Sequence, residues 1–362
     1  MFHKEYRIYA TTINGDIEEM AHDILSQIDT DGHILKLVFF HSPADNNEYI
    51  ANRKALYKAV GEHHKQQSPL VSYVAQRPYG YTMLAEATYL VDTGIKVERG
   101  DGFLLLSNGE ARELITQSIS ANDIDAPTGA QTDAIFNKID NILKANGFTI
   151  DNIYRQWNYI EGITKVNANR QNYQEFNDAR TRFYNKTQWS NGYPAATGIG
   201  TEKGGVGIEI MACNSHMRPN RAIDNPLQVS AHSYSQQVLA GDTPDKTTPK
   251  FERARMLCDN IYISGTAAIR GEHSMDKADT VAQAADTMYI MNHLVSAANI
   301  PGATDNSRYN ILRVYVKQSA QIPAVEQFMN VHYPATQKYY VTADICREEL
   351  LIEIEGIATV MR

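Results

Sequence analysis

The hydrophobic positions of this chain follow two periods that alternate along it. In residues 283–300, apolar side chains recur every three or four positions, which predicts an amphipathic helix. The flanking residues 262–272, 310–318 and 340–358 are apolar or alternate with polar positions, as strands covered by a helix on one face do. The segment therefore predicts a strand with a Gly-Thr turn, a helix, another strand and a final pair of strands.

The same succession occurs twice more along the chain. In the middle it runs as strand, helix, strand and closing strands through residues 102–107, 131–147, 153–163 and 193–213. Near the start, a less regular copy has a helix, a strand and a closing pair of strands at residues 15–29, 33–43 and 71–90. In the two later copies a glutamine, Gln131 or Gln283, begins the helix. The chain is therefore predicted to repeat one structural unit three times.

These units predict an α+β fold class, in which helices pack on mixed β-sheets. The expected boundaries are residues 1–97, 98–240 and 250–362, with the polar stretch 240–250 and its two prolines as a linker. Three such units in one chain predict a pseudo-trimeric arrangement, because one chain can then form the interfaces that three identical subunits would share. A monomer with an internal pseudo-threefold axis is expected, and further oligomerisation is left open.

Composition narrows the classes of partner. The chain has 362 residues, 43% of them hydrophobic and 21% charged, which is typical of a globular protein of two or three domains. A net charge of −8 argues against nucleic-acid binding, and an anionic substrate would need cations gathered in one pocket. The first residues contain no apolar run of a signal peptide, and no window is long and apolar enough for a transmembrane helix. With three cysteines, an odd number, we expect reduced thiols and a cytoplasmic protein without a membrane partner.

Longer motifs carry a resemblance to a known family. The Gly-Thr turn, the helices begun by glutamine and the closing Glu-Ile-Glu-Gly-Ile-Ala resemble the reactive-intermediate deaminase (YjgF-like, RidA-like) fold. Five motifs in order are similar to those of the chorismatase family, at residues 169–184, 193–200, 225–234, 264–272 and 343–356. The resemblance runs from about residue 98 to the C-terminus. It implies an enzyme that releases pyruvate from chorismate without a metal or redox cofactor, with its site in the last unit and a wall from the middle one.

The closing strand offers a candidate acid. Releasing pyruvate requires a proton at the methylene carbon of the enol ether, and a carboxylic acid whose pKa is raised by an apolar setting suits that step. Alternation puts Glu353 and Glu355 on one face of the strand, so one of the two could stay protonated. The resemblance implies that Glu353, seven residues after Cys346, is the acid. Glu355 and Cys346 are the other catalytic candidates, and Glu355 either serves structure or tunes Glu353. The alternative is that both glutamates face solvent.

Binding the two carboxylates of chorismate needs fixed cations, and arginine suits this task because its fork donates two parallel hydrogen bonds. Arg170, Tyr173 and Arg180 are the favoured substrate contacts, and Arg347 is a further candidate. The alternative for each arginine is a solvated surface charge. In the glycine-rich stretch 193–207, the resemblance implies that Thr197 and Gly198 form part of the pocket wall; the alternative is a long hairpin turn.

Two positions bear on the product. In the family, a cysteine at Cys346 accompanies formation of a hydroxybenzoate, whereas an aliphatic residue there goes with hydrolysis to a dihydroxycyclohexadiene carboxylate. At the second position, Ala267 stands where the benzoate-forming relatives carry glycine, so the two markers disagree. The cysteine carries more weight, because a thiol could contact the intermediate while a methyl group only trims volume. The expected product is therefore 3- or 4-hydroxybenzoate, with the diene as the alternative.

Other kinds of function are less consistent with the sequence. The chain has no CxxC or HExxH spacing, so no metal site is expected. An imine or enamine deaminase of the same fold would place an arginine before the last strand pair, where this chain has Lys338. A non-catalytic protein that binds a small ligand is the remaining alternative.

Overall fold

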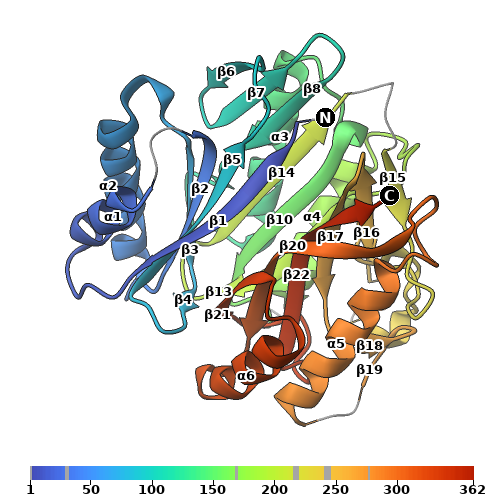
Figure 1. The fold of residues 1–362 in the computed structure, drawn as a ribbon. Helices are drawn as coiled ribbons and strands as arrows, with labels where there is room; N and C mark the ends of the chain where they lie inside the picture. The colour runs from blue at the N-terminus through green and yellow to red at the C-terminus, as the bar shows by residue number, and fades with distance from the viewer. Residues whose placement is uncertain (1, 29–31, 168–169, 215–219, 240–245, 276–277) are drawn as a thin grey trace.

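Three β-sheets, each covered by helices on its outer side, make up the protein (Figure 1). The computed structural model describes residues 2–28, 32–167, 170–214, 220–239, 246–275 and 278–362. Most of the expected linker, residues 240–245, therefore lies outside the described residues, as do the last residue of the helix expected at 15–29 and Asn169 of the first motif.

The first sheet has the strand order β1-β5-β2-β3, with α1 and α2 on its outer face. Its elements are β1 (Lys4–Thr11), α1 (Ile17–Ser26), β2 (His33–His41), α2 (Asn46–His64), β3 (Leu70–Ala75) and β5 (Met83–Leu90). Asp16 begins α1 with a capping box, since its carboxylate accepts from the backbone of Glu19 and the Glu19 side chain accepts from the backbone of Asp16.

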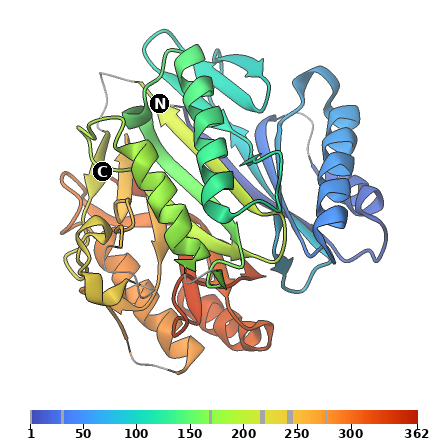
Figure 2. The ribbon, with the colours of Figure 1, turned by 180° about the vertical axis from the view of Figure 1, so that it is seen from behind.

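The second sheet has the order β13-β10-β14-β8-β7-β6, and β9 pairs with β14. Figure 2, the view from behind, shows its two helices lying across the outer face of the sheet. Its elements are β6 (Lys96–Gly100), β7 (Phe103–Ser107), β8 (Arg112–Thr116), β9 (Ile119–Ser120), α3 (Thr128–Ala145), β10 (Ile153–Glu161), α4 (Asn172–Tyr184), β13 (Ala195–Thr201) and β14 (Val206–Cys213). A small separate ribbon consists of β11 (Val166–Asn167) and β12 (Arg170–Gln171).

The third sheet has the order β15-β16-β17-β22-β20-β21-β4. Its elements are β15 (Asn220–Ile223), β16 (Ala254–Leu257), β17 (Asn260–Thr266), α5 (Thr280–Leu294), β20 (Asp305–Val316), α6 (Ile322–His332), β21 (Gln337–Thr342) and β22 (Ile352–Met361). Its edge strand β4 (Arg77–Pro78) comes from the N-terminal part of the chain, so this sheet joins distant segments. The ribbon of β18 (Ile269–Arg270) and β19 (His273–Ser274) lies beside it.

The three sheets share one topology. In each, a middle strand (β2, β10 or β20) runs parallel to the strand after it and antiparallel to the last strand of the unit. The expected α+β fold class with repeated units on mixed sheets is therefore confirmed. The hairpin considered for residues 193–207 is wrong, because β13 and β14 lie on opposite sides of β10. Strands β10 and β13 are parallel, so the chain must cross over through α4 between them.

Four hydrophobic clusters explain how the units assemble. Three of them lie between a sheet and its own helices. The fourth joins the inner faces of all three sheets and contains, among others, Phe40 of β2, Tyr154 of β10 and Tyr315 of β20. The inner faces thus converge on one centre with helices outside, which is the expected pseudo-trimeric arrangement. The unit boundaries 1–97, 98–240 and 250–362 stay a proposal.

Gln131 and Gln283 occupy matching places, although neither begins its helix. Helices α3 and α5 start at Thr128 and Thr280, three residues earlier, and Asp279 caps the latter. The side-chain oxygen of Gln131 accepts from the amide of Val206, at the start of β14, at 2.9 Å. The oxygen of Gln283 accepts from the amide of Leu351, just before β22, at 2.9 Å. Each glutamine therefore ties a helix to the last strand of its unit.

Of the helices described, none is both long and apolar enough to span a membrane.

Candidate active site

A cavity of about 1000 Å³ opens between the second and third sheets, beside α4 and the loop that precedes β22. Its size is at the upper end of the range for small-molecule sites. Six of the residues expected at the site line it: Tyr173, Gly198, Ala267, Cys346, Arg347 and Glu353. The structure thus brings together side chains from the middle and last units.

Glu353 lies on β22 with its side chain at the cavity wall, and the residue is only 5% exposed. Burial, together with the negative charge of Glu355, raises the pKa of Glu353 to about 8, although Arg155 opposes the rise. Gly265 of β17 faces the carboxyl group so closely that a Cβ there would lie 2.0 Å from Oε1 of Glu353. Near neutrality, Glu353 is therefore a mostly protonated acid in a cavity.

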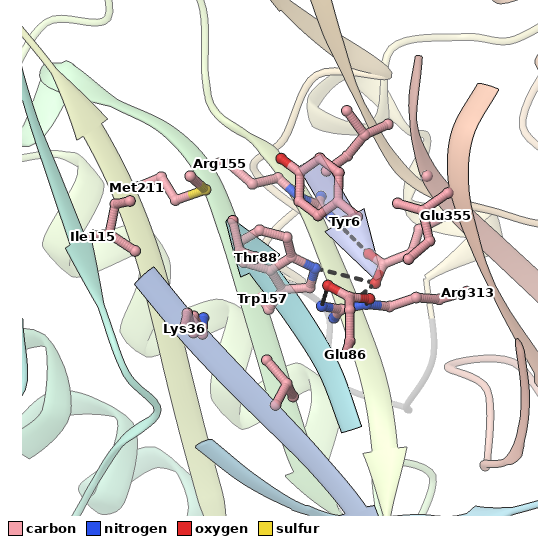
Figure 3. Close-up of a pocket in the computed structure, with 14 residues that line it drawn as sticks. Tyr6, Lys36, Glu86, Thr88, Ile115, Arg155, Trp157, Met211, Arg313 and Glu355 are labelled. Carbon is pink, nitrogen blue, oxygen red and sulfur yellow. Dashed lines mark hydrogen bonds and ion pairs between the residues drawn. The ribbon is translucent and has the colours of Figure 1, made fainter. Parts of the chain in front are cut away.

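Glu355 has a different environment, on the side of the central core (Figure 3). It accepts hydrogen bonds from Tyr315 Oη at 2.7 Å, Trp157 Nε1 at 3.1 Å and Arg313 Nη1 at 3.2 Å. It also forms an ion pair with Arg155 and accepts from the Thr197 hydroxyl. Burial alone would raise the pKa of Glu355, but the two guanidinium groups and these hydrogen bonds hold it below its usual range. The alternative that both glutamates face solvent is wrong, since both are buried.

Thr197 connects the two glutamates without facing the cavity. Its hydroxyl accepts from Arg155 Nη2 at 2.8 Å and from the backbone amide of Gly265 at 3.1 Å. Because the same hydroxyl donates to Glu355, Thr197 fixes the strand that carries Gly265 against the ion pair behind it. The structure therefore places Thr197 one layer behind the wall.

Gly198 opens the cavity beside it. A Cβ at this position would lie 3.0 Å from the ring of Tyr173 on α4, so a side chain would crowd that ring. Strand register puts Tyr73 at the equivalent position of the first unit. The ring of Tyr73 stacks on Tyr49 of α2 with centroids 5.0 Å apart and fills the corresponding space there. The glycine is thus one reason that the cavity forms at this interface.

Two arginines bring positive charge to the cavity, and one of them was not expected. Arg253, just before β16, is buried; its Nη2 donates to Val229 O at 2.5 Å and to Tyr234 Oη at 2.6 Å. Within the described part of the chain its Nε has no hydrogen-bond partner. Arg347 Nη1 donates to Glu272 O and Ser274 Oγ, each at 3.1 Å. Both guanidinium groups lie over the ring of Tyr234, 5.5 and 5.4 Å from its centroid. Their hydrogen bonds go to neutral oxygens, which leaves charge for an anionic ligand.

The two arginines favoured from the sequence lie elsewhere. Arg170 forms an ion pair with Asp178 and does not line the cavity. Arg180 is 1% exposed behind the wall, where its Nη2 donates to Asn177 Oδ1 at 2.6 Å. Among the described residues its Nε lacks a partner, and Asn177 itself lines the cavity. The predicted contacts of Arg170 and Arg180 with a substrate stay predictions, and the nearer charges are those of Arg253 and Arg347.

Cys346 and Ala267 both line the cavity. Burial and the charge of Glu353 raise the pKa of the Cys346 thiol to about 12, although Arg347 opposes this. The sulfur is therefore a neutral thiol rather than a nucleophilic thiolate. Ala267 is buried at the end of β17, and its methyl group reduces the space available near the acid.

Three comparisons relate the chain to known proteins. The family described as "Chorismatase FkbO/Hyg5-like, N-terminal" matches residues 90–212. A 3-hydroxybenzoate synthase from Streptomyces hygroscopicus is 28% identical over 250 residues, which cover 64% of this chain and 71% of that protein. A chorismatase from the same organism is 27% identical over 281 residues, covering 74% of this chain and 75% of the relative.

A crystal structure of a chorismatase supports the same assignment at the level of the fold. It superposes with a TM-score of 0.72 at 20% identity and covers 99% of both chains. The motifs, the matching family description, the curated relatives and this shared fold agree with one another. In sequence and in fold, the chain is similar to chorismatases.

Proposed function

We propose that this protein releases pyruvate from chorismate and forms a hydroxybenzoate, either the 3- or the 4-isomer. The names of the relatives, 3-hydroxybenzoate synthase and chorismatase, support this activity. The observation that carries the proposal is Glu353, a buried acid with a pKa near 8 at the wall of a cavity that also holds Arg253 and Arg347. A cytoplasmic location, expected from the sequence, is part of the proposal.

Glu353 supplies the proton that starts the reaction. The proton goes to the methylene carbon of the enol ether, which becomes the methyl group of pyruvate and leaves an oxocarbenium ion. In the route to 4-hydroxybenzoate, the bond between ring carbon and ether oxygen then breaks with its electron pair on oxygen, which becomes the keto oxygen of pyruvate. The ring loses a proton and becomes aromatic, and the proton lost can restore Glu353. Pyruvate and hydroxybenzoate together contain all atoms of chorismate, whereas the diene would require one added water.

The arginines hold the dianion. Arg253 and Arg347 both lie next to Tyr234 in the cavity wall, so each could receive one carboxylate. A buried guanidinium with an unused N–H gains more from an anion than an exposed one does, because the surroundings screen the charge less. Cys346 contacts the same space as a neutral thiol and is the proposed guide toward the aromatic product.

The direct test is to incubate the purified protein with chorismate and identify the products by mass and retention time. Pyruvate together with a hydroxybenzoate supports the proposal. Pyruvate with only the dihydroxycyclohexadiene carboxylate would replace aromatisation by hydrolysis. No release of pyruvate would refute the activity itself.

A further inference from the structure

The shared topology allows residues of the three units to be compared by register. Three basic residues occupy equivalent positions on the middle strands: Lys36 of β2, Arg155 of β10 and Arg313 of β20. Three glutamates occupy equivalent positions on the last strands: Glu86 of β5, Glu209 of β14 and Glu353 of β22. Each of them pairs with the residue that comes two positions after the basic residue on the middle strand of its unit. The proposed catalytic acid is thus one of three related glutamates.

Two of the three glutamates form an ion pair with the next unit. Arg313 of the third unit donates from Nε and Nη2 to the two oxygens of Glu86 in the first unit, at 2.8 Å each. Lys36 of the first unit pairs with Glu209 of the second. All four side chains are buried. The cycle therefore runs from the third unit to the first and from the first to the second.

The cycle would be completed by Arg155 of the second unit pairing with Glu353 of the third. Arg155 forms an ion pair with Glu355 instead. The residues equivalent to Glu355 are Thr88 in the first unit and Met211 in the second, and neither carries a charge. Glu355 is therefore an additional carboxylate at the one interface where the expected ion pair is missing.

Arg155 lies near both carboxylates, since it pairs with Glu355 and its charge also acts on Glu353. Its Nη2 bonds to the hydroxyl of Thr197, whose methyl group would lie 3.2 Å from a Cβ on Gly265, the residue that touches Glu353. The other guanidinium nitrogen, Nη1, is buried and has no hydrogen-bond partner among the described residues. Glu353 and Glu355 thus compete for Arg155. Glu355 is favoured because Tyr315, Trp157, Arg313 and Thr197 also donate hydrogen bonds to it.

We infer that Glu355 is a positioning residue that diverts Arg155 from Glu353 and so leaves the acid of the third interface without an ion-pair partner among the described residues. This inference rests on the proposed role of Glu353 as the proton donor. In the first two units the related glutamate forms an ion pair with a cation of the neighbouring unit. In the third, the cation is engaged and the glutamate can carry a proton.

Other charged or titratable groups also face Glu353 and belong to the comparison. From neighbouring elements these are Arg155 of β10, Tyr315 of β20, Tyr173 of α4 and Cys346 and Arg347 of the loop before β22. The pKa of Tyr173 and of Cys346 is raised by burial, so both are neutral near pH 7 and do not compete for the proton. Glu355 and Arg155 are the charges that can be changed without touching the cavity wall.

The experiment substitutes Glu355 by the residues of the related units, Glu355→Met and Glu355→Thr, with Glu355→Gln as a variant of matched size. The protonated carboxyl of Glu353 is followed by the infrared carbonyl band that Glu353→Gln lacks, without substrate. In the wild type the band should persist at pH 7 and vanish as the pH rises through about 8. In each Glu355 variant, Arg155 is released to pair with Glu353, so the band should be absent at pH 7. If the pKa of Glu353 then falls to the ordinary carboxyl value of 4.5, kcat at pH 7 should drop by at least ~10²-fold.

A double variant separates positioning from loss of structure. Glu355→Met combined with Arg155→Met removes both charges, so Glu353 again lacks a cation and the band should return at pH 7. A purely structural role of Glu355 would predict further damage and no return. Persistence of the band in Glu355→Met and Glu355→Gln, or no return of it in the folded double variant, would overturn the inference. Because the infrared measurement needs no chorismate, a wild-type protein that shows the band but releases no pyruvate would refute the proposed function and not the diversion of Arg155.

Discussion

Replacing Glu353 by glutamine tests the proposed mechanism most directly. Glutamine keeps the length and shape of a side chain that is 5% exposed and faces Gly265, so the strand should accept it. The amide cannot deliver a proton to the methylene carbon, so kcat should fall by about 10²- to 10⁴-fold, the usual contribution of a general acid. Chorismate binding should change little, because a neutral acid is exchanged for a neutral amide.

The raised pKa sets the expected pH dependence. With a pKa of about 8, roughly nine-tenths of Glu353 is protonated at pH 7, against about 1 part in 300 for a carboxyl at 4.5. The environment thus increases the amount of competent acid by roughly 300-fold at that pH. Because the protonated form is active, kcat of the wild type should decline as the pH rises through about 8.

The same shift has a cost in stability. A group whose pKa is higher in the folded state contributes its stability fully below the unfolded pKa, near 4.5, and loses it as the pH rises toward the folded pKa of about 8. At pH 7 the loss for Glu353 is on the order of 3 kcal/mol. Glu353→Gln should therefore unfold at a higher urea concentration than the wild type at pH 8, and the difference should disappear at pH 4.

The assay couples pyruvate release from chorismate to the oxidation of NADH by lactate dehydrogenase. Glu98→Gln, a change of an exposed glutamate on β6, is the matched control and should retain wild-type kcat. If Glu353→Gln turns over at the wild-type rate, the strand is only structural and the acid lies elsewhere. If its stability follows the wild type at every pH, the raised pKa of Glu353 is itself refuted.

Three further predictions concern the cavity. Arg253→Ala should raise KM for chorismate by about 10²-fold, because a substrate carboxylate loses its charged partner. The control Arg182→Ala, at an exposed arginine paired with Asp133, should leave KM unchanged. Equal KM values for the two variants would show that Arg253 does not bind the substrate. Cys346→Val should shift the products from hydroxybenzoate toward the dihydroxy-diene, and a wild type that gives only the diene would make Ala267 the better marker. Turnover should survive exhaustive chelation by EDTA, since the described residues contain no group of three His, Cys, Asp or Glu that could hold a metal ion; a loss restored by a divalent ion would contradict this.

Local pattern was sufficient to predict the repeated units and the positions at the end of the chain. The alternation of β22 put Glu353 and Glu355 on one face, and the motif placed Cys346 nearby. Both glutamates are buried at the interface of the second and third units, and Cys346 is partly buried beside them. Helix α2 was not predicted, because its inward-facing set includes Tyr49 and Asn52 and gives a weak apolar period. The order of the strands could not be read either, since pairing across β10 depends on the crossover through α4 rather than on neighbouring residues.

The parts of the site that sequence reasoning missed depend on partners far apart in the chain. Arg253 follows no motif, and its place in the cavity comes from the strand it precedes, β16, and from Tyr234. Arg170 belongs to a motif of the family, yet in the fold it finds Asp178 on the next helix. The different fates of Glu353 and Glu355 are set by Arg155, which lies in another unit. A pattern along one segment contains no record of such contacts.

The three related ion-pair positions also bear on why a single chain suits this chemistry. In a trimer of identical subunits, a substitution that freed one glutamate from its cation would free all three, and the cost of each buried acid would be incurred three times. Here the Arg313–Glu86 and Lys36–Glu209 pairs keep two interfaces closed, so only one gives up stability for reactivity. Fusion of the repeats thus permits an asymmetry that three identical subunits could not have: two interfaces serve stability, and the third serves catalysis.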